Sequence, residues 1–522
     1  MPETEFSRLL DLENHPRGYD DINLLSNVKD LCAANTLNAD SQPDLEINAT
    51  LRDISDKLTK LAVPAAFYSC VMCISPVVSL YFAAKFGTDV YAGFSLESIF
   101  VNLTGICVFA GVSSAARTLC SQNFGAGDLK AVALTLQRCY LILSLLAVAI
   151  YILWQYAENI FLLIGIDPPV CRVIKLLVSI HSLGLPYEVI SNSYKHYLEG
   201  IGELLPVLLS EFSFVLLFLS FNTLFIDILN YSYLAIAWAY IISSYGSLAV
   251  LLFSSRTETI IQTTQLYFSF ELVTGLPEFL SFGIPGCVMV SVEWWTTDIL
   301  GVIAGQLSMQ AVAAHSILLQ FIIIAYRVTF GVGTAAATLV GNSIGAKQYS
   351  SISKIVTVAL IFAVMIDVIL GVVICVFRTP LCHLFSSDPD VINIAVPILP
   401  YLALCLFVES AQVICGLVLT GMGEQAYVAG INLISCYVIG LPLAYWLCFR
   451  AGFGVAGLIY GVYGGTIVQL ISYLVVVVRS TQSLLHRSPS CSTTLLLVDR
   501  SVMETPNPDC KSGAVLLTST HP

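Results

Sequence analysis

Three carboxylic acids occur inside long apolar runs of this chain, where a charged side chain is costly. Glu293 and Asp298 both lie in the run SVEWWTTDIL, and Glu409 lies in CLFVESAQ. A charged carboxylate at the centre of a membrane-spanning helix costs at least about 2.5 kcal/mol on insertion scales. Each acid therefore needs a polar partner or a function, and the usual functions are the binding of protons and of cations.

An acid that is removed from water can alternate between a proton and a bound cation. Burial disfavours the charged form, so such a group can hold a proton near neutral pH. Trp294 and Trp295 precede Asp298 by about one helical turn, which places aromatic faces beside an acid. A dry aromatic face attracts a cation by up to about 2 kcal/mol. Competition between a proton and a cation for one carboxylate is the minimal chemistry of an antiporter.

Each of these residues also has a purely structural interpretation. Glu293 and Glu409 could hydrogen-bond across helices without a role in transport, and Asp298 could be a hydrated acid near the membrane interface. Trp294 and Trp295 could pack or anchor the interface. Five residues turn a helix by about 140°, so Glu293 and Asp298 face different directions and we expect different roles for them.

Two basic side chains complicate the acidic pattern. Arg327, in IIIAYRVTF, could extend its guanidinium towards the cytoplasm, or it could pair with Glu409 or Glu293. We expect the first arrangement. His315, in QAVAAHSIL, could accept a proton from outside, although a lone histidine at that depth is more often a bonded interface residue.

The elements that carry these residues must lie in a membrane. Of the 522 residues, 57% are hydrophobic and only 11% are charged, at a mean hydropathy of +0.83. This is more apolar surface than one soluble core can bury. Runs long enough to cross about 30 Å of hydrocarbon recur along the chain, and without barrel-type alternation they must be helices. We predict twelve spans, at 58–84, 92–115, 132–156, 169–197, 203–227, 232–254, 276–304, 310–335, 350–377, 390–419, 424–448 and 453–478.

The chain is a tandem duplication. The block GVSSAARTLCSQNFGAG at 111–127 returns as GVGTAAATLVGNSIGAK at 331–347. A period this long excludes solenoids and predicts two related lobes. Six spans in each copy make the repeats parallel, with the lobes related by an axis along the membrane normal. The repeat also pairs Glu188 with Glu409, so Glu188 is either a second functional acid or an inherited structural group.

Small and amide side chains of the duplicated block could hold two helices close together. They are Gly111, Gln122 and Gly125 in the first copy, and Gly331, Asn342 and Gly345 in the second. Glycine lets helix backbones approach closely, and an amide can bond the exposed backbone of a turn. We expect packing and hinge elements rather than phosphate loops, because the lysine and hydroxyl of a P-loop are missing.

The predicted organisation has five parts. They are an acidic tail at 1–57, a six-helix lobe at 58–254, an inter-lobe loop at 255–275, a second six-helix lobe at 276–478 and a polar tail at 479–522. The net charge of −12 is concentrated in the first tail, which argues against nucleic-acid binding. Basic residues gather on the face that holds both tails, so we expect both termini in the cytoplasm. The membrane that we expect is the plasma membrane.

Three motifs together resemble the multidrug and toxin extrusion (MATE) family. They are SQNFGAG followed by Gln137-Arg138, the segment GNSIGA at 341–346, and Glu293-Trp294-Trp295. The motifs are specific in combination and weak singly, and the similarity covers the whole membrane part. The resemblance implies an all-α, twelve-helix, two-lobe transporter that exports organic cations in exchange for protons or sodium.

The resemblance also implies which residues contact substrate and proton. Glu293 matches the seventh-span glutamate of the family, Asp298 matches a second acid five residues on, and Glu409 matches the tenth-span glutamate. Gln320 stands where animal members usually carry a further glutamate, and Arg327 is a departure. Together with Trp294 and Trp295, these acids and Gln320 form the expected binding set.

We predict from these features a proton-coupled antiporter of organic cations that acts as a monomer in the bilayer. It needs no enzymatic activity, cofactor or metal. The alternatives are a sodium-coupled exporter of the same fold and a lipid-linked sugar flippase, which would need a large cationic cavity for phosphate. A membrane-embedded enzyme and a passive channel are further, less favoured alternatives.

Overall fold

The computed structural model describes residues 50–265, 267, 270–386 and 388–487, and in this part of the chain every regular element is helical. Twelve helical segments are long and apolar enough to cross a membrane. The predicted all-α architecture is confirmed. Most of the two predicted polar tails lies outside the described residues.

The first repeat contains six spans, some of them built from two helices joined by a short 3-10 or π segment. Its helices are α3 (Leu51–Met72), α4 (Ile74–Ala83), α5 (Thr88–Val101), α6 (Cys107–Gly125), α7 (Leu129–Gln155), α8 (Ala157–Ile164), α9 (Pro168–His181), α10 (Leu185–Ile201), α11 (Leu205–Asn222) and α12 (Leu234–Ser254). The joining segments are η2 (Ala84–Phe86), η3 (Asn102–Ile106), η4 (Ser182–Gly184) and η5 (Thr223–Ile228).

Two short helices, α13 (Glu258–Thr263) and α14 (Glu271–Thr274), connect the repeats. The second repeat then contains α15 (Leu276–Gly305), α16 (Met309–Gly345), α17 (Ser350–His383), α18 (Pro389–Ala395), α19 (Leu399–Met422), α20 (Gln425–Asn432), η6 (Leu433–Gly440), α21 (Leu441–Tyr445), η7 (Trp446–Arg450) and α22 (Val455–Arg487).

Local chemistry fixes where several of these helices begin and end. The amide of Thr50 donates to Asp53 Oδ2 at 2.9 Å and the amide of Asp53 donates to Thr50 Oγ1 at 3.3 Å, a capping box that starts α3 earlier than the predicted 58. Gly202 and Gly423 occupy equivalent repeat positions and end α10 and α19 at φ of 85° and 88°. Glycine adopts this left-handed conformation without strain, so both repeats stop their helices in the same way.

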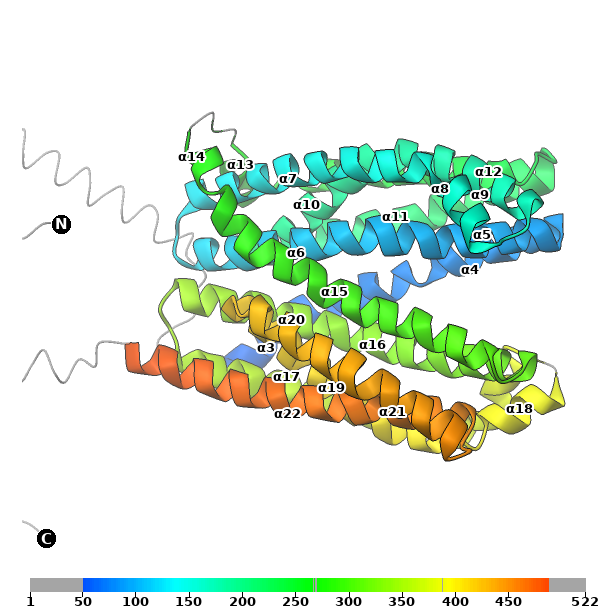
Figure 1. Cartoon of the computed structure of the whole chain (residues 1–522). Helices are drawn as coiled ribbons and strands as arrows, with labels where there is room; N and C mark the ends of the chain where they lie inside the picture. Colours follow the sequence, from blue (N-terminus) through cyan, green and yellow to red (C-terminus); the bar gives the residue numbers. More distant parts are fainter. Residues whose placement is uncertain (1–49, 266, 268–269, 387, 488–522) are drawn as a thin grey trace, which may run out of the picture.

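The repeats form two lobes that lie side by side (Figure 1). The first helix of each repeat, α3 or α15, begins in the opposite lobe (Figure 1). Ile54, Leu58 and Ala62 of α3 belong to a core made otherwise of second-repeat residues. Phe279 of α15 likewise belongs to the core of the first repeat. The two lobes are therefore locked together at the end of the bundle where α3 begins and α22 ends, which we call the terminal side.

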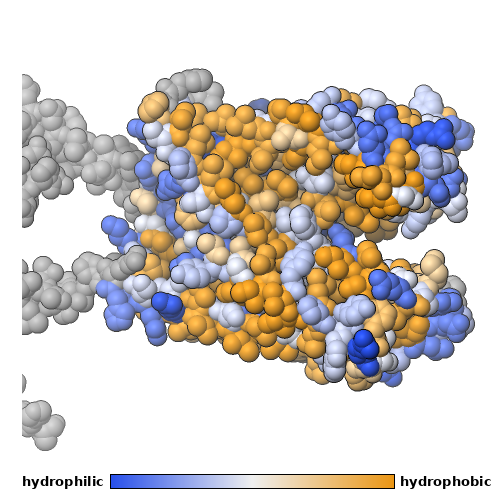
Figure 2. Space-filling model, viewed as in Figure 1, coloured by the Kyte–Doolittle hydropathy of each residue, from blue (hydrophilic) through white to orange (hydrophobic). Residues whose placement is uncertain are grey.

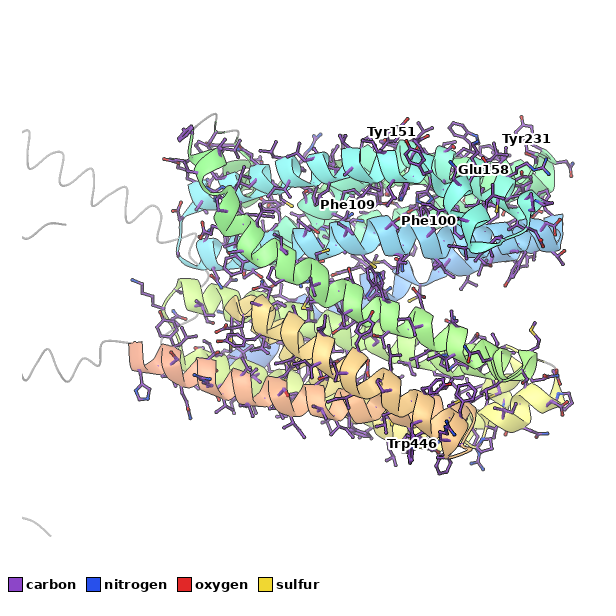
Figure 3. All side chains as sticks on the ribbon, viewed as in Figure 1. Phe100, Phe109, Tyr151, Glu158, Tyr231 and Trp446 are labelled. Atoms are coloured by element: carbon purple, nitrogen blue, oxygen red, sulfur yellow. The ribbon has the colours of Figure 1, made fainter. Side chains whose placement is uncertain are left out.

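Apolar side chains cover the outer flank of both lobes in a broad band, with hydrophilic residues towards the ends (Figure 2). Tyr151 and Trp446 project from this surface, at 48% and 55% exposure, whereas Phe100 and Phe109 are buried in the first lobe (Figure 3). At the end opposite the terminal side, a hollow separates the lobes (Figure 2). Such a surface requires an apolar surrounding, as in a bilayer, because exposing this much apolar area to water is unfavourable.

Candidate functional site

A cavity of about 360 Å³ lies in the second repeat, with Asn102 of η3 contributing from the first. Its walls come from α15, α16, α19, η6 and α22, and its charged lining residues are Glu293, Asp298, His315, Arg327 and Glu409. The structure thus brings the three predicted acids together in one cavity. The volume suits a small organic molecule, since ligand pockets commonly measure about 300–1,000 Å³.

Glu293 is held by amide side chains from the last two spans. Its Oε1 accepts hydrogen bonds from Asn432 Nδ2 at 2.8 Å and from Gln469 Nε2 at 3.4 Å. Gln469 also donates to Asn432 Oδ1 at 2.7 Å, and Tyr473 Oη donates to the same oxygen. Among the described residues Glu293 forms no ion pair, so the network orients the carboxyl group without neutralising it.

Asp298 and Glu409 are less tightly held. Asp298 Oδ2 is buried and has no hydrogen-bond partner among the described residues. Glu409 is partly buried and lines the same cavity from α19. A buried polar atom without a partner is costly, so a ligand or a proton that reaches this cavity gains an interaction that the protein itself does not supply.

One of the two predicted tryptophans faces the cavity and the other does not. Trp294 belongs to the lining, together with Tyr326 and Tyr463. Trp295 is 39% exposed and lies outside the lining. Adjacent helical residues point about 100° apart, and on α15 this rotation turns the ring of Trp295 out of the lining that Trp294 joins. The aromatic wall therefore consists of Trp294 and two tyrosines that the sequence did not indicate.

Gln320 is also outside the lining, contrary to the expected binding set. Leu319, Ile322 and Ile323 face the cavity from α16, whereas Gln320 is exposed on another side of that helix. The same one-residue rotation explains the difference. The position of the missing family glutamate thus contributes nothing to the cavity in this structure.

Arg327 lines this cavity and a smaller one described below, rather than reaching the cytoplasmic surface as expected. Its Nε is buried with no hydrogen-bond partner, and it forms no ion pair with Glu293 or Glu409 in the described part of the chain. His315 is only 1% exposed, and both of its ring nitrogens lack partners there as well. The cavity therefore contains acidic and basic side chains that form no ion pairs with one another among the described residues.

Sequence reasoning missed several polar residues around the acids. Asp367 of α17 is 1% exposed and accepts a hydrogen bond at 2.8 Å from Ser410, the neighbour of Glu409. It stands in the apolar run AVMIDVILGV, so the signal that identified Glu409 also marks it. Asn432 and Gln469 gave no comparable signal, because neutral amides occur in many membrane helices as packing groups.

A second, smaller cavity of about 110 Å³ lies between the lobes, towards the terminal side. Ser114, Arg117 and His196 line it from the first repeat. From the second repeat it shares Glu293 and Arg327 with the larger cavity. These shared residues form the boundary between the two spaces.

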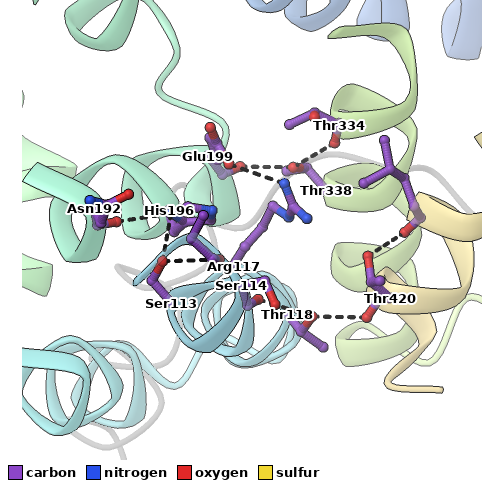
Figure 4. Close-up of polar contacts among 12 residues, drawn as sticks. Ser113, Ser114, Arg117, Thr118, Asn192, His196, Glu199, Thr334, Thr338 and Thr420 are labelled. Carbon is purple, nitrogen blue, oxygen red and sulfur yellow. Dashed lines mark hydrogen bonds and ion pairs between the residues drawn. The ribbon is translucent and has the colours of Figure 1, made fainter. Parts of the chain in front are cut away.

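Beyond the smaller cavity, matching hydrogen bonds join the repeats (Figure 4). Thr118 Oγ1 donates to the carbonyl of Thr420, and Thr338 Oγ1 donates to the carbonyl of Glu199, both at 2.8 Å. Each threonine occupies the same position in its own copy of the duplicated block. The internal symmetry thus extends to individual bonds across the lobe interface.

Gly125 and Gly345, two of the predicted glycines of the duplicated block, lie at this interface between the repeats, which we call the terminal seam. A Cβ on Gly345 would lie 1.9 Å from the carbonyl oxygen of Gln122, and one on Gly125 would lie 2.2 Å from that of Asn342. Gln122 Nε2 also donates to the carbonyl of Gly421 at 3.0 Å. No side chain fits at either glycine while the seam is closed.

Two further glycines let the crossing helices approach. A Cβ on Gly111 would lie 2.4 Å from Cα of Cys287 in α15, and one on Gly331 would lie 2.2 Å from the amide nitrogen of Ala66 in α3. Ala66 and Cys287 are themselves equivalent repeat positions. The hinge role of these glycines stays a prediction, whereas their close contacts are a direct feature of the structure.

A buried ion pair sits where the seam meets the smaller cavity. Arg117 Nη1 lies 3.3 Å from Glu199 Oε2, with side-chain exposures of 5% and 6%. Tyr68 Oη donates to the other oxygen of Glu199 at 2.6 Å. On the cavity side, Ser113 Oγ lies 3.2 Å from Nδ1 of His196 (Figure 4). Arg117 therefore has a dedicated counter-charge, unlike Arg327.

The two lobes arise from a sequence duplication and are joined at one end, and an acid-lined cavity lies in the second. This combination is typical of membrane transporters built from parallel repeats. The MatE family model matches residues 64–224 and 285–446, one copy in each repeat. The chain belongs to this family of multidrug and toxin extrusion transporters.

Individual relatives agree with this assignment. The chain is 32% identical over 418 residues to multidrug and toxin extrusion protein 1 of Homo sapiens, covering 80% of this chain and 73% of that protein. It is 28% identical over 426 residues to multidrug and toxin extrusion protein 2 of Mus musculus, covering 82% and 74%. Among solved structures, the eukaryotic MATE transporter AtDTX14 matches with a TM-score of 0.76 at 23% identity, covering 84% of this chain and 99% of that one.

Proposed function

We propose that this protein is a secondary active antiporter that exports organic cations in exchange for protons. The observation that carries the proposal is the cavity lined by Glu293, Asp298 and Glu409 beside the ring of Trp294. Acids attract a cation and an aromatic face adds to the attraction in a dry site. Two relatives that are 31% and 32% identical are named for multidrug and toxin extrusion, which supports this class of substrate.

In the proposed cycle, Glu293 and Glu409 alternate between proton and substrate. A deprotonated acid binds the cation when the cavity faces the cytoplasm, and protonation from outside displaces it. The amide donors on Glu293 Oε1 keep the carboxyl group in place in both states. Asp298, one and a half turns further along α15, assists the cation without being the exchanging group.

Access changes when the lobes rock about the terminal seam. Opening breaks the Thr118 and Thr338 bonds to the opposite repeat and separates the glycine contacts. One pH unit is worth about 1.4 kcal/mol, so an electroneutral one-for-one exchange accumulates substrate about tenfold per unit. If both termini are cytoplasmic, as expected, the terminal side is the inner face. Because the seam on that side is closed, the structure then represents the state open to the outside of the plasma membrane.

Sodium coupling is the main alternative, because Ser410, which follows Glu409 in the chain, hydrogen-bonds to Asp367 and Thr329 and so gathers several oxygen atoms around one point of α19. Hard cations prefer oxygen ligands. A lipid-linked sugar flippase is a poorer fit. Its phosphate would need the basic cavity at Arg117 and His196, which measures only about 110 Å³ and in which Arg117 already has a partner.

Uptake of tetraethylammonium into proteoliposomes, driven by an imposed gradient, tests the proposal. We expect uptake to follow a pH gradient in the absence of sodium and to be lost in Glu293→Gln and Glu409→Gln. Glu158→Gln is the matched control, since Glu158 pairs with Lys175 away from the cavity. Uptake that follows a sodium gradient alone would select the alternative, and uptake unchanged in both cavity variants would contradict the assigned site.

A further inference from the structure

The cation-binding cavity contains a positive charge that a pure cation carrier does not need. Arg327 lines both cavities and marks their boundary. Its Nε is buried with no hydrogen-bond partner, and it takes part in no ion pair among the described residues. By contrast, Arg117 in the smaller cavity is paired with Glu199 at 3.3 Å. Arg327 is thus the cationic side chain of this region whose charge the protein leaves uncompensated.

An uncompensated guanidinium in a membrane is expensive, and it persists only where it has a function. It also repels any cation that enters the cavity. Guanidinium binds a carboxylate or sulfonate through paired N–H donors, with stronger hydrogen bonds than neutral groups form. Within the described ranges no carboxylate pairs with Arg327, although Glu293 and Glu409 line the same cavity.

We propose that Arg327 is an anion-binding subsite, and that the preferred substrates are organic zwitterions with a cationic group and a carboxylate or sulfonate on one apolar body. This inference rests on the proposed function for its cationic half, which lies against Glu293 and Glu409. The anionic group then lies on Arg327 at the boundary of the two cavities. His196 and Ser114, on the far side of the smaller cavity, offer neutral hydrogen-bonding groups to the same end of the substrate.

This assignment accounts for the charge balance of the site. A simple cation satisfies one acid and leaves Arg327 unpaired, whereas a zwitterion satisfies one acid and the guanidinium together. The two adjoining cavities, of about 360 and 110 Å³, also offer more space than a small quaternary ammonium ion fills. A substrate whose two charges are separated can occupy both cavities.

A matched pair of dyes tests the proposal. Rhodamine 110 carries a carboxylate beside its cationic ring system, and its methyl ester, rhodamine 123, carries the cation alone. We would measure the binding of both by fluorescence anisotropy to the full-length protein in detergent. We expect the wild type to bind rhodamine 110 at least about tenfold more tightly, the range of one charge-assisted hydrogen-bond pair.

Substitution of Arg327 should reverse this preference. In Arg327→Gln the affinity for rhodamine 110 should fall about 10- to 100-fold, while that for rhodamine 123 should rise because a repulsive charge is removed. Arg327→Lys keeps the charge without the paired donors and should retain part of the preference. Arg172→Gln is the matched control, because Arg172 is exposed on α9 outside both cavities.

The results separate this inference from the proposed function. Equal affinities for the two dyes in the wild type, or a preference for rhodamine 110 that survives in Arg327→Gln, would overturn the anion subsite. Tetraethylammonium exchange that depends on Glu293 would still support the cation antiporter in that case. Absence of that exchange and of rhodamine 123 binding would instead overturn the proposed function and the inference with it.

Discussion

Asn432 and Gln469 determine how Glu293 is presented to the cavity. Both amides donate to Oε1, and they are linked to each other and to Tyr473. A carboxyl group on a free rotamer would lose conformational entropy when it binds a ligand, whereas a pre-oriented group has already lost it. The network should therefore contribute to affinity by orienting Glu293, and Gln469 also lines the cavity directly.

Removal of Asn432 should weaken both stability and substrate affinity. Asn432→Ala leaves the amide of Gln469 and the hydroxyl of Tyr473 short of a partner, at a cost of about 1–3 kcal/mol. Thermal unfolding followed by tryptophan fluorescence and the KM for tetraethylammonium measure the two effects. Asn222→Ala is the control, because Asn222 is equally buried in the other lobe and bonds only the carbonyl of Phe218 at 2.7 Å. An unchanged KM in Asn432→Ala would show that the network does not support Glu293.

At the scale of elements, buried hydrogen bonds between the repeats cross the terminal seam beside a buried ion pair. The ion pair of Arg117 and Glu199 lies on α6 and α10, and the backbone of Glu199 accepts a bond from Thr338 of α16. The ion pair lies within the first repeat, and the bond from Thr338 links this buried pair to the second repeat. Opening the seam breaks the Thr338 bond and leaves the ion pair inside its own lobe.

Single substitutions in the buried ion pair should be more damaging than the double substitution. Arg117→Met leaves the carboxylate of Glu199 unpaired at 6% exposure and should destabilise the protein by about 3–5 kcal/mol. Arg117→Met combined with Glu199→Gln removes both charges and should recover a large part of that loss. The unfolding midpoints of the single and double variants provide the comparison, and strictly additive effects would contradict a coupled pair.

A methyl group at Gly345 should force the terminal seam open. The added Cβ meets the carbonyl of Gln122, and Gly345→Ala should therefore favour the state open on the terminal side. Maleimide labelling of Ser121→Cys reports this opening, because Ser121 is 1% exposed in the closed seam. We expect labelling to increase severalfold with Gly345→Ala and to stay constant with Gly430→Ala, whose Cβ would meet nothing within 4 Å. Equal labelling in both backgrounds would mean that the glycine contact does not hold the seam.

At the scale of the whole molecule, the sequence predicted the membrane-spanning helices and the two-lobe architecture. Twelve spans follow from the cost of apolar surface in water, and the acids Glu293 and Glu409 stand out because lipid penalises them. The exchange of α3 and α15 between lobes was not predictable, since it depends on packing between distant segments. For the same reason the sequence did not indicate which of the expected residues line the cavity: Trp295 and Gln320 lie outside the lining and Arg327 lies in it, because rotation about a helix axis is set by the neighbouring helices.

The central claim is that proton and organic cation compete for the same acids, and proton release on substrate binding tests it most directly. Tetraethylammonium is added to the purified protein in weakly buffered detergent solution with a pH indicator, across a range of about pH 6 to 8. We predict release approaching about one proton per bound cation at the acidic end of the range. The release should diminish as the pH rises, because the acids are then already deprotonated, and it should vanish when Glu293→Gln and Glu409→Gln are combined. Cation binding without proton release at any pH, or release that persists in the double variant, would contradict the account.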